Sequence, residues 1–333
     1  MQRLVPLTSL RRVFPRTFAS TGHLTHLTHR AILAKMTSTS TWDGSGTQED
    51  LMYRDECILV VREGLPRFFR APRGGRRARP TAFRTTPIAT STFALRTHPD
   101  RPAVSATQDA KDAIVGHDSK YASHRFIPDQ PKGKLHRAFS VFLFDENDRL
   151  LLQQRAASKI TFPSLWTNTC CSHPLYGYEP SEVDTDEDIK SGAVPGAKRA
   201  AIRKLEHELG VAPASVPLRK FKYLTRLHYC AADAFATNQE INGGPWGEHE
   251  MDYILFIKPE TRVAIEPNPE EVDDFRWVTR DELREMMDPK SGLRWSPWFR
   301  IIAEKFLDTW WADLENCLNT EKHVDLETVH EVM

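Results

Sequence analysis

The chain has 333 residues, a length that accommodates one or two domains. Its 45 basic side chains balance 45 acidic ones, which argues against a nucleic-acid partner attracted by net charge. No apolar run approaches the roughly 18 residues of a membrane-spanning helix, so no membrane span is predicted. The five cysteines are irregularly spaced and include no CxxC pair. We therefore expect free thiols in an intracellular, reducing compartment rather than a disulfide framework or a structural zinc site.

Residues 1–42 form a basic leader. They contain no Asp or Glu, and six Arg and Lys residues are scattered among Ser, Thr and Leu. This composition is typical of a mitochondrial transit peptide. The alternative is that a cytosolic form starts at Met36. We expect a cytoplasmic protein, or a mitochondrial one if the leader is a true transit peptide, and the leader is left out of the fold prediction.

A second unusual segment, residues 61–108, is rich in Arg, Pro, Thr and Gly, as in residues 71–77. It has no sustained period of either strand or helix. Such a segment buries too little apolar surface to offset the entropy lost on ordering, so it is predicted to be disordered. Folded structure is expected on both sides of it, in residues 43–60 and 109–333.

The first elements predicted in the long C-terminal part are two strands. Residues 136–144 are apolar and rich in strand-forming side chains, and residues 150–154 form a second short run. The polar residues 145–148 between them favour a turn, so we predict a hairpin. Residues 196–209 have apolar side chains at helical spacing and are followed by Gly210, which predicts a helix that ends at this glycine.

The segment between the hairpin and this helix, residues 175–195, is acidic. Its carboxylates are Glu179, Glu182, Asp184, Asp186, Glu187 and Asp188. Charge runs of this kind are usually solvated, so we predict a loop exposed to solvent rather than a second metal site.

Further strands are predicted at residues 221–229, 251–257 and 275–278. A capping box at residues 279–282 predicts a short helix, and Pro297 opens a last long helix. The apolar stripe of that helix comprises Trp298, Ile301, Ile302, Phe306, Trp310 and Leu314, with Lys305 at its edge. Strands and helices mixed in this way predict an α/β sandwich.

A thiol and an imidazole lie two residues apart in residues 166–174, which have no helical period. In an extended backbone, side chains two apart point to the same side, so Cys171 and His173 are expected to face one point. They form either a metal-ligand pair or a reactive cysteine beside a polar partner. The alternative is a small buried cysteine near a hydrogen-bonded histidine. Glu248 and Glu250 are also two apart, so two carboxylates share one face.

Three stretches carry a resemblance to a known family. Residues 135–140 (LHRAFS), 167–174 (TNTCCSHP) and 246–250 (WGEHE) occur in this order. Together they closely resemble the type I isopentenyl-diphosphate isomerases of the eukaryotic, fungal-like kind. The resemblance implies a Nudix-like α/β/α sandwich with a mixed sheet, formed as one catalytic domain by residues 109–333, with residues 43–60 as the start of the family-like region.

The activity that the resemblance implies is the interconversion of isopentenyl diphosphate and dimethylallyl diphosphate, in the biosynthesis of isoprenoid and sterol precursors. The alkene is protonated to a tertiary carbocation and then deprotonated, so the site needs an acid, a base and no water near the cation. By position, Cys171 and Glu250 match the two proton-transfer residues. Tyr229 matches the tyrosine that hydrogen-bonds to the carboxylate. Cys170 is expected to point away from the site.

The resemblance also implies a site for one divalent ion. A mixed set of imidazole and carboxylate ligands suits an octahedral ion with one open position. The ligands by position are His124, His136, His173, Glu248 and Glu250. Mg²⁺ is expected, and the ligand types alone leave Mn²⁺ and Zn²⁺ open. His117 is a weaker alternative to His124, and His249 is expected to be structural.

The diphosphate group of the substrate requires cations. The side chains that match the family's substrate-binding positions are Lys120, Arg155, Lys159 and Lys204. Glu208 matches a carboxylate that holds a second Mg²⁺ bridging the diphosphate. Trp298 is expected to lay its ring against the carbocation, and a core tryptophan at a helix start is the alternative. The expected partner is thus a small diphosphate, bound by a monomer.

The rival enzyme class is a Nudix hydrolase that cleaves a nucleoside diphosphate. That chemistry requires a helix with the pattern Arg-Glu-apolar-x-Glu-Glu-x-Gly. In the corresponding residues 203–210, Lys204 and His207 replace two of the three glutamates, which argues against hydrolysis. A catalytically inert metal-binding protein is disfavoured by the retained proton-transfer residues.

Compared with the family, residues 61–108 look inserted. In the family, a strand similar to the one that ends at Val60 is followed almost directly by a stretch similar to residues 111–120. Our hypothesis is a translated intron or a gene-model error, and the alternative is a genuine basic insertion. Sequencing the spliced message distinguishes the two, because a transcript that retains these codons excludes the artefact.

Overall fold

The structure, a computed structural model, describes residues 47–61, 112–235 and 244–332. By its internal contacts the chain divides into residues 1–40 and residues 41–333, and the described residues all belong to the second unit. The basic leader and all but the first residue of the segment 61–108 lie outside the described residues. None of the helices described is long and apolar enough to span a bilayer.

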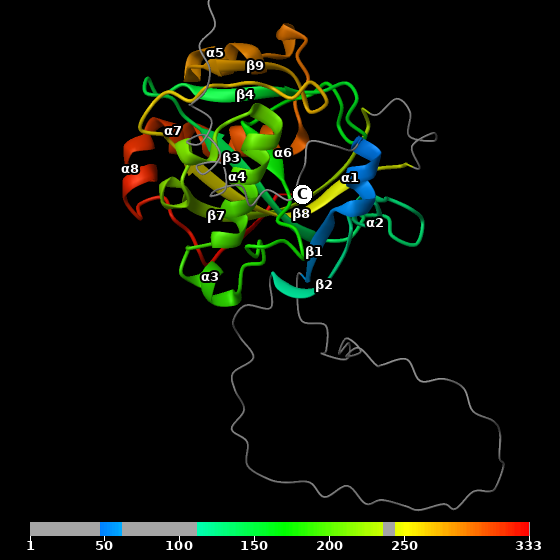
Figure 1. The fold of residues 1–333 in the computed structure, drawn as a ribbon. Coiled ribbons are helices and arrows are strands. Elements are labelled where there is room, and N and C mark those ends of the chain that lie inside the picture. The colour runs from blue at the N-terminus through cyan, green and yellow to red at the C-terminus, as the bar shows by residue number, and fades with distance from the viewer. Residues whose placement is uncertain (1–46, 62–111, 236–243, 333) are drawn as a thin grey trace, which may run out of the picture. The chain divides into compact units, whose positions relative to one another are not determined.

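A seven-stranded mixed sheet forms the centre of the second unit (Figure 1). Its strands are β1 (Glu56–Val61), β2 (Ala113–Ser119), β3 (His136–Leu143), β6 (Cys170–Ser172), β7 (Lys222–Ala232), β8 (Gly247–Ile257) and β10 (Val329–Glu331). They run in the order β10-β7-β8-β3-β1-β2, and β6 also pairs with β3. β3 and β8 are parallel and almost wholly buried, which is why both contain long apolar runs.

A second sheet of three strands lies beside the first, in the order β5-β4-β9. Its strands are β5 (Trp166–Thr167), β4 (Leu150–Arg155) and β9 (Val272–Val278). The predicted hairpin of residues 136–144 and 150–154 is therefore wrong. Both edges of β3 are occupied, by β8 on one side and by β6 and β1 on the other, so β4 keeps only the bridge between Phe144 and Leu150.

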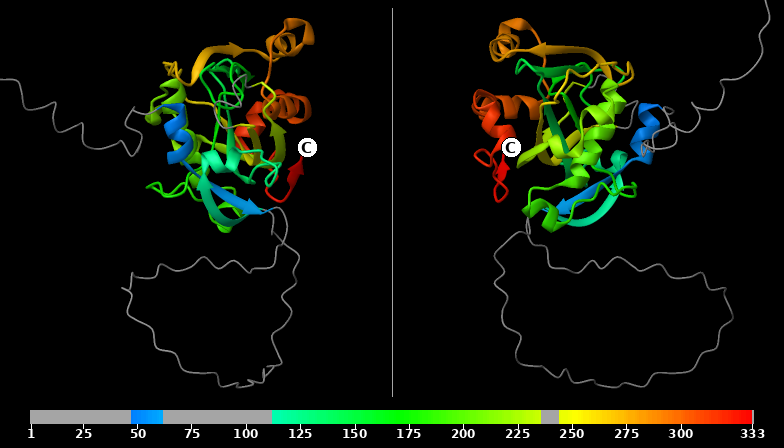
Figure 2. Two further views of the ribbon diagram at one scale, coloured as in Figure 1. Left: turned by 90° about the vertical axis from the view of Figure 1, so that its right-hand side faces the viewer. Right: turned by 60° about the vertical axis from the view of Figure 1, so that its left-hand side comes forward.

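Helices cover both faces of the large sheet, which confirms the predicted α/β/α sandwich (Figure 2). α4 (Pro195–Leu209) packs against one face. The C-terminal helices α6 (Pro297–Ile302), α7 (Asp308–Ala312) and α8 (Leu314–Asn319) pack against the other. α4 ends as predicted at Gly210, whose φ of 64° is a left-handed conformation that glycine adopts without strain.

The last helix is interrupted, although one long helix from Pro297 was expected. A π-helical turn, Ala303–Leu307, separates α6 from α7 and shifts the buried face. Leu307 and Trp311, outside the predicted stripe, are buried, whereas Phe306 is only half-buried. The remaining helices are α1 (Gln48–Arg54), α2 (Lys120–His124), α3 (Asp186–Lys190) and α5 (Arg280–Met287), with 3-10 turns at Pro213–Ser215, Leu218–Lys220 and Pro289–Ser291.

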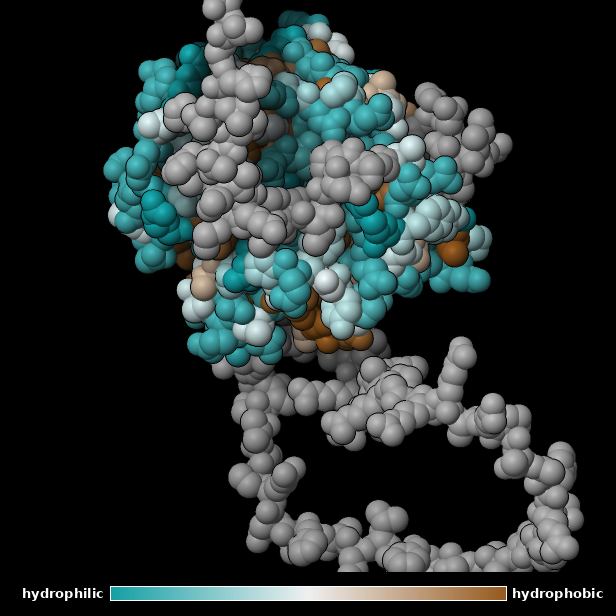
Figure 3. All heavy atoms as spheres, viewed as in Figure 1, coloured by the Kyte–Doolittle hydropathy of each residue, from teal (hydrophilic) through white to brown (hydrophobic). Residues whose placement is uncertain are grey.

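Most large apolar side chains of the described residues are buried in two clusters, one on each face of the large sheet. Figure 3 accordingly shows only small brown patches among hydrophilic residues. The large apolar side chains that remain exposed are Tyr53, Ile114, Val115 and Tyr176.

The acidic segment 175–195 is not the solvated loop that was predicted, because two of its carboxylates are buried. Glu182 accepts hydrogen bonds from the guanidinium of Arg203, at 2.6 and 2.8 Å. Asp184 accepts from the first N–H groups of α4, those of Gly196 and Ala197, at 2.6 and 2.8 Å. A helix N-terminus stabilises a carboxylate in this way. These partners follow 12 or more residues later in the chain, so local charge pattern did not predict them.

The described residues on either side of residues 62–111 meet in the sheet, because Val61 and Ala113 are direct antiparallel partners. Asp112, the residue before Ala113, is buried, and its carboxylate binds the guanidinium of Arg137 at 2.8 Å and that of Arg226 at 3.2 Å. Since partners on paired strands lie about 5 Å apart, a three-residue connection can join them.

We therefore expect that replacing residues 62–111 with Asn-Gly, and so retaining Asp112, leaves the melting temperature within about 3 °C and the activity within about twofold of the full chain. Differential scanning calorimetry and an isomerase assay measure both quantities. An insoluble or inactive product would show that the segment contributes to the fold.

Candidate active site and metal centre

One narrow pocket contains nearly all the predicted site residues. Its lining consists of Lys120, Arg155, Lys159, Thr161, Cys171, Ser172, His173, Lys204, Glu208, Tyr229, Glu248, Glu250 and Trp298. Its volume of about 30 Å³ holds about one water molecule, so a larger ligand enters only if the side chains around it move apart. A larger cleft of about 650 Å³ between α5 and the α6–α7 region contains none of the predicted site residues.

The five predicted metal ligands lie together. The ligand atoms of His124, His136, His173, Glu248 and Glu250 all lie within 4.8 Å of one another, and all five residues are buried. His124 is the last residue of α2, and His173 directly follows β6. His136 is the first residue of β3 and lies beside its partner Glu250 on β8. His117, the weaker alternative, instead pairs with Glu56 on the surface at 2.7 Å.

The hydrogen bonds of the cluster fix which ring nitrogens face inward. The Nδ1 atoms of His124 and His136 lie 2.6 and 2.7 Å from the carbonyl oxygens of Lys120 and Lys134, so each Nδ1 carries the proton that it donates. The Nε2 lone pair of His124 then faces Glu248 Oε2 at 2.8 Å. Either a proton on Nε2 or a bound cation would stabilise this contact.

Three buried atoms of the cluster make no hydrogen bond: His124 Nε2, His136 Nε2 and Glu248 Oε2. Burial and the neighbouring His124 lower the pKa of His136 to about 3, which keeps its imidazole in the neutral form that binds metals. The imidazole and carboxylate donors thus fit a divalent cation.

Cys171 and Glu250 face the pocket from different strands. Cys171, opposite Ser140 on β3, is half-buried and lines the pocket, whereas Cys170 is fully buried in the core beneath α4. Adjacent residues of β6 thus point to opposite sides, as an extended strand requires. Burial raises the pKa of Cys171 to about 12, although Arg155 opposes the rise, so the thiol keeps its proton at neutral pH.

Tyr229 is the cross-strand partner of Glu250, and its hydroxyl donates a hydrogen bond to Glu250 Oε2. The other oxygen, Oε1, lies 2.8 Å from His173 Nε2. Burial and the nearby Glu248 raise the pKa of Glu250 well above its usual range. The carboxyl group therefore lies between a phenol and the metal cluster. His249 faces the other way and bonds to His228 at 2.9 Å, which agrees with a structural role.

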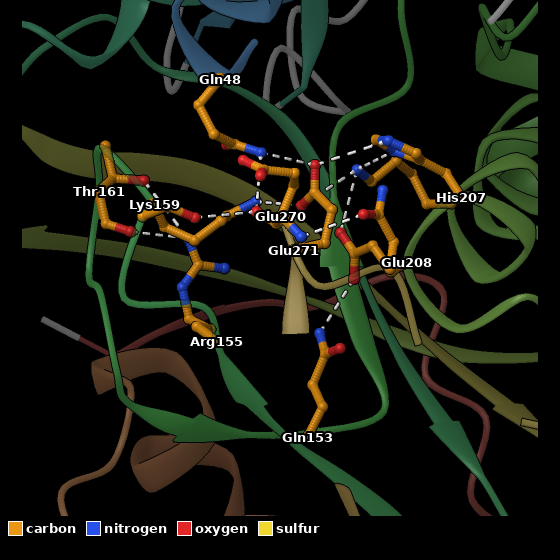
Figure 4. A network of polar contacts seen from close by, with 12 residues as sticks. Gln48, Gln153, Arg155, Lys159, Thr161, His207, Glu208, Glu270 and Glu271 are labelled. Carbon is orange, nitrogen blue, oxygen red and sulfur yellow. Dashed lines mark hydrogen bonds and ion pairs between the residues drawn. The ribbon is translucent and has the colours of Figure 1, made fainter. Parts of the chain in front are cut away.

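The predicted diphosphate-binding cations all line the pocket. The guanidinium of Arg155 lies over the ring of Trp298, 5.6 Å from its centroid. Lys204 Nζ lies 3.0 Å from Glu208 Oε1, and the second oxygen of Glu208 accepts from Gln153 at 2.9 Å (Figure 4). Burial lowers the pKa of Lys204, but the carboxylates of Glu208 and Glu271 together outweigh it, and the net shift of the pKa is upward.

One residue of this region, Glu271, was missed by the sequence prediction. Its carboxylate is buried, binds Lys159 Nζ, and lies 3.8 Å from Lys204 Nζ (Figure 4). The sequence does not distinguish Glu271 from its exposed neighbour Glu270. The two residues differ only in the side chains that the tertiary structure places beside them. Burial lowers the pKa of Lys159 to about 8, with Glu271 acting in the opposite direction.

Comparison with known proteins identifies a matching family profile and several proteins of similar sequence. A family profile described as NUDIX domain matches residues 134–299. The chain is 45% identical over 229 residues to isopentenyl-diphosphate Delta-isomerase 1, chloroplastic, of Cannabis sativa, covering 67% of this chain and 72% of that protein. It is 44% identical to isopentenyl-diphosphate Delta-isomerase I of Camptotheca acuminata, covering 68% of this chain and 89% of that one.

A fungal relative gives the same result. The isopentenyl-diphosphate delta-isomerase of Schizosaccharomyces pombe is 47% identical over 209 residues, covering 62% of this chain and 83% of that protein. Identity at this level extends over most of each relative. The chain therefore belongs to the type I isopentenyl-diphosphate isomerase family, which has the Nudix fold.

Proposed function

We propose that this chain interconverts isopentenyl diphosphate and dimethylallyl diphosphate, with Cys171 and Glu250 as the two proton-transfer residues. The observation that most directly supports the proposal is that both side chains line one narrow, mostly buried pocket. The two side chains come from separate strands, β6 and β8. One can therefore protonate one carbon of a bound substrate while the other deprotonates a different carbon.

The isomerisation adds a proton to the terminal methylene carbon of isopentenyl diphosphate and removes one from C2. The double bond moves, and the enzyme ends each turnover with as many protons as it had at the start. One of the two residues donates and the other accepts, and the reverse reaction exchanges their roles. Tyr229, through its bond to Glu250 Oε2, holds the carboxyl group in place for either role.

Trp298 is proposed to face the carbocation. Its buried indole lines the pocket, and Nε1 donates to Asn168 Oδ1 at 3.2 Å. The amide of Asn168 also donates to the carbonyl of Cys170 at 2.9 Å, so one side chain aligns the indole with strand β6. An aromatic face stabilises a desolvated cation by about 2 kcal/mol.

The five-residue cluster is proposed to hold Mg²⁺, with Mn²⁺ and Zn²⁺ as alternatives that metal analysis of the purified protein separates. When bound, the ion would favour the ionised form of Glu250 and fix its position. The histidines, held by the carbonyls of Lys120 and Lys134, keep their lone pairs directed at one point.

The diphosphate is proposed to bind Lys120, Arg155, Lys159 and Lys204, which all line the pocket. Glu208 is the proposed ligand of a second Mg²⁺ that bridges the diphosphate. Lys204 and Gln153 each contact one of its two oxygens, and each oxygen keeps a further lone pair that could bind the ion.

The NUDIX match makes nucleoside diphosphate hydrolysis the second candidate. The geometry of α4 disfavours it. The ammonium of Lys204 lies 3.0 Å from Glu208 and 2.9 Å from His207 Nδ1, where the hydrolase pattern has carboxylates for a metal cluster. With Lys204 and His207 at these positions, two of the three carboxylates that the hydrolase metal cluster requires are missing.

One experiment separates these functions. The protein is incubated in deuterated water with Mg²⁺ and isopentenyl diphosphate, and in parallel with nucleoside diphosphates. Deuterium in the methyl groups of dimethylallyl diphosphate, detected by NMR, supports the isomerase. Phosphate release from nucleotides without deuterated product supports the hydrolase, and neither product would mark an inert scaffold.

Replacing Tyr229 with phenylalanine is expected to lower kcat about 10- to 100-fold with KM nearly unchanged. The change removes one charge-assisted hydrogen bond to Glu250, worth about 1.5–3 kcal/mol. Tyr223→Phe is the matched control, since Tyr223 is buried on the same strand and its hydroxyl makes no hydrogen bond. Equal kcat values for both variants would contradict a role for Tyr229.

A further inference from the structure

The buried carboxylate of Glu271 lies behind the diphosphate end of the pocket without lining it. Glu271 is the residue before β9 and contacts four side chains from other parts of the chain. Lys159 Nζ binds its Oε2, and Lys204 Nζ lies 3.8 Å from the same oxygen. On the other oxygen, Oε1, Gln48 Nε2 donates at 2.9 Å and His207 Nε2 lies at 3.7 Å. Figure 4 shows Gln48, Lys159 and His207 around Glu271.

We propose that Glu271 is a positioning residue for the substrate diphosphate, which it aligns by holding the ammonium groups of Lys159 and Lys204 at the pocket wall. This proposal rests on the proposed function of the two lysines as diphosphate ligands. Glu271 itself does not touch the substrate, since it is absent from the pocket lining.

The two lysines need a common anchor because they come from separate elements. Lys159 follows β4 in a loop, and Lys204 lies in the middle of α4. A lysine side chain has many rotamers, so an unanchored ammonium loses entropy when it binds a phosphate. Glu208 reaches only one of them, at 3.0 Å from Lys204. Glu271 is the carboxylate that contacts both among the described residues.

The charges also balance around this point. Lys159 and Lys204 together carry two positive charges, and Glu208 and Glu271 carry two negative ones, all of them buried. The attraction of each buried ammonium group to the shared anion offsets their mutual repulsion. Each ammonium has three N–H donors. Lys159 directs one of them to Glu271, and Lys204 directs one to Glu208 and one to His207 Nδ1. The remaining donors can face the diphosphate oxygens without a change in the position of either lysine.

The test compares KM and kcat for isopentenyl diphosphate in four proteins: the full chain, E271Q, K159M and the double variant. E271Q is expected to raise KM about tenfold and to change kcat less than about threefold. In the K159M background, E271Q should raise KM by a smaller factor, about threefold, because only the contact with Lys204 remains. The matched control is E270Q, an exposed carboxylate next in the chain, which should leave both constants unchanged.

Other results would overturn the proposal. An unchanged KM in E271Q, or the same factor in both backgrounds, would mean that Glu271 has only a structural role. If E271Q does not fold, E271D is the second variant. Its side chain keeps the charge but is shorter by one methylene group, so KM should rise about threefold. An unchanged KM would again overturn the proposal. A normal KM in K159M would show instead that the diphosphate role of the lysine is wrong.

Discussion

Replacing Cys171 with alanine will lower kcat by at least about a thousandfold, since it removes one of the two proposed proton-transfer groups. The thiol lines the same pocket as Glu250 and makes no hydrogen bond that holds the fold together among the contacts described. The melting temperature should therefore change by no more than about 3 °C. NMR detection of dimethylallyl diphosphate and circular dichroism measure the two effects.

Cys170→Ala is the matched control for this prediction. Its side chain is fully buried in the cluster beneath α4, on the opposite face of β6 from the pocket. The variant should lose about 1 kcal/mol of stability and keep its kcat within about threefold. If the Cys170 variant were inactive and the Cys171 variant active, the assignment of the two faces of β6 would be reversed.

Chelation of divalent ions will abolish isomerisation, and adding back Mg²⁺ or Mn²⁺ will restore it. The physical reason lies in the cluster itself: His124 Nε2 and Glu248 Oε2 face each other at 2.8 Å, both as acceptors, within a buried site. A cation removes that repulsion and holds Glu250 in place, so its loss should lower both turnover and thermal stability. Activity and melting temperature after EDTA treatment and dialysis measure the change.

A variant of one ligand makes this prediction specific. Glu248→Gln keeps the size of the side chain but removes a charged ligand, and it should weaken metal binding by at least about tenfold in a titration followed by calorimetry. His117→Ala is the control, because His117 pairs with Glu56 outside the cluster. An enzyme that turns over normally after complete metal removal would contradict the ligand set.

The pairing of residues on the same face was predictable from sequence. Because side chains alternate along a strand, the spacing of Cys171 to His173 and of Glu248 to Glu250 predicted that each pair would share a face, and the structure places both pairs in the pocket. The helix that ends at Gly210 and the capping box at Thr279 follow from equally local rules. The family resemblance rested on the order of the three motifs. It predicted which residues far apart in the chain are ligands of the same metal ion.

Strand partners and the burial of charged residues depended on tertiary structure. The short run of β4 is compatible with a hairpin, but both edges of β3 are already occupied, so β4 joins another sheet. Glu182, Asp184 and Glu271 have the same side-chain chemistry as their exposed neighbours, and each is buried because a cation or helix end from a distant part of the chain lies beside it.

The sequence alone thus determined which side chains share a face of one element, since strand and helix periods are local. Only the tertiary structure decided which faces of different elements meet. The position of a carboxylate between two lysines depends on contacts between residues more than 60 positions apart, such as Lys204 and Glu271. The periodicity of the sequence does not predict such contacts.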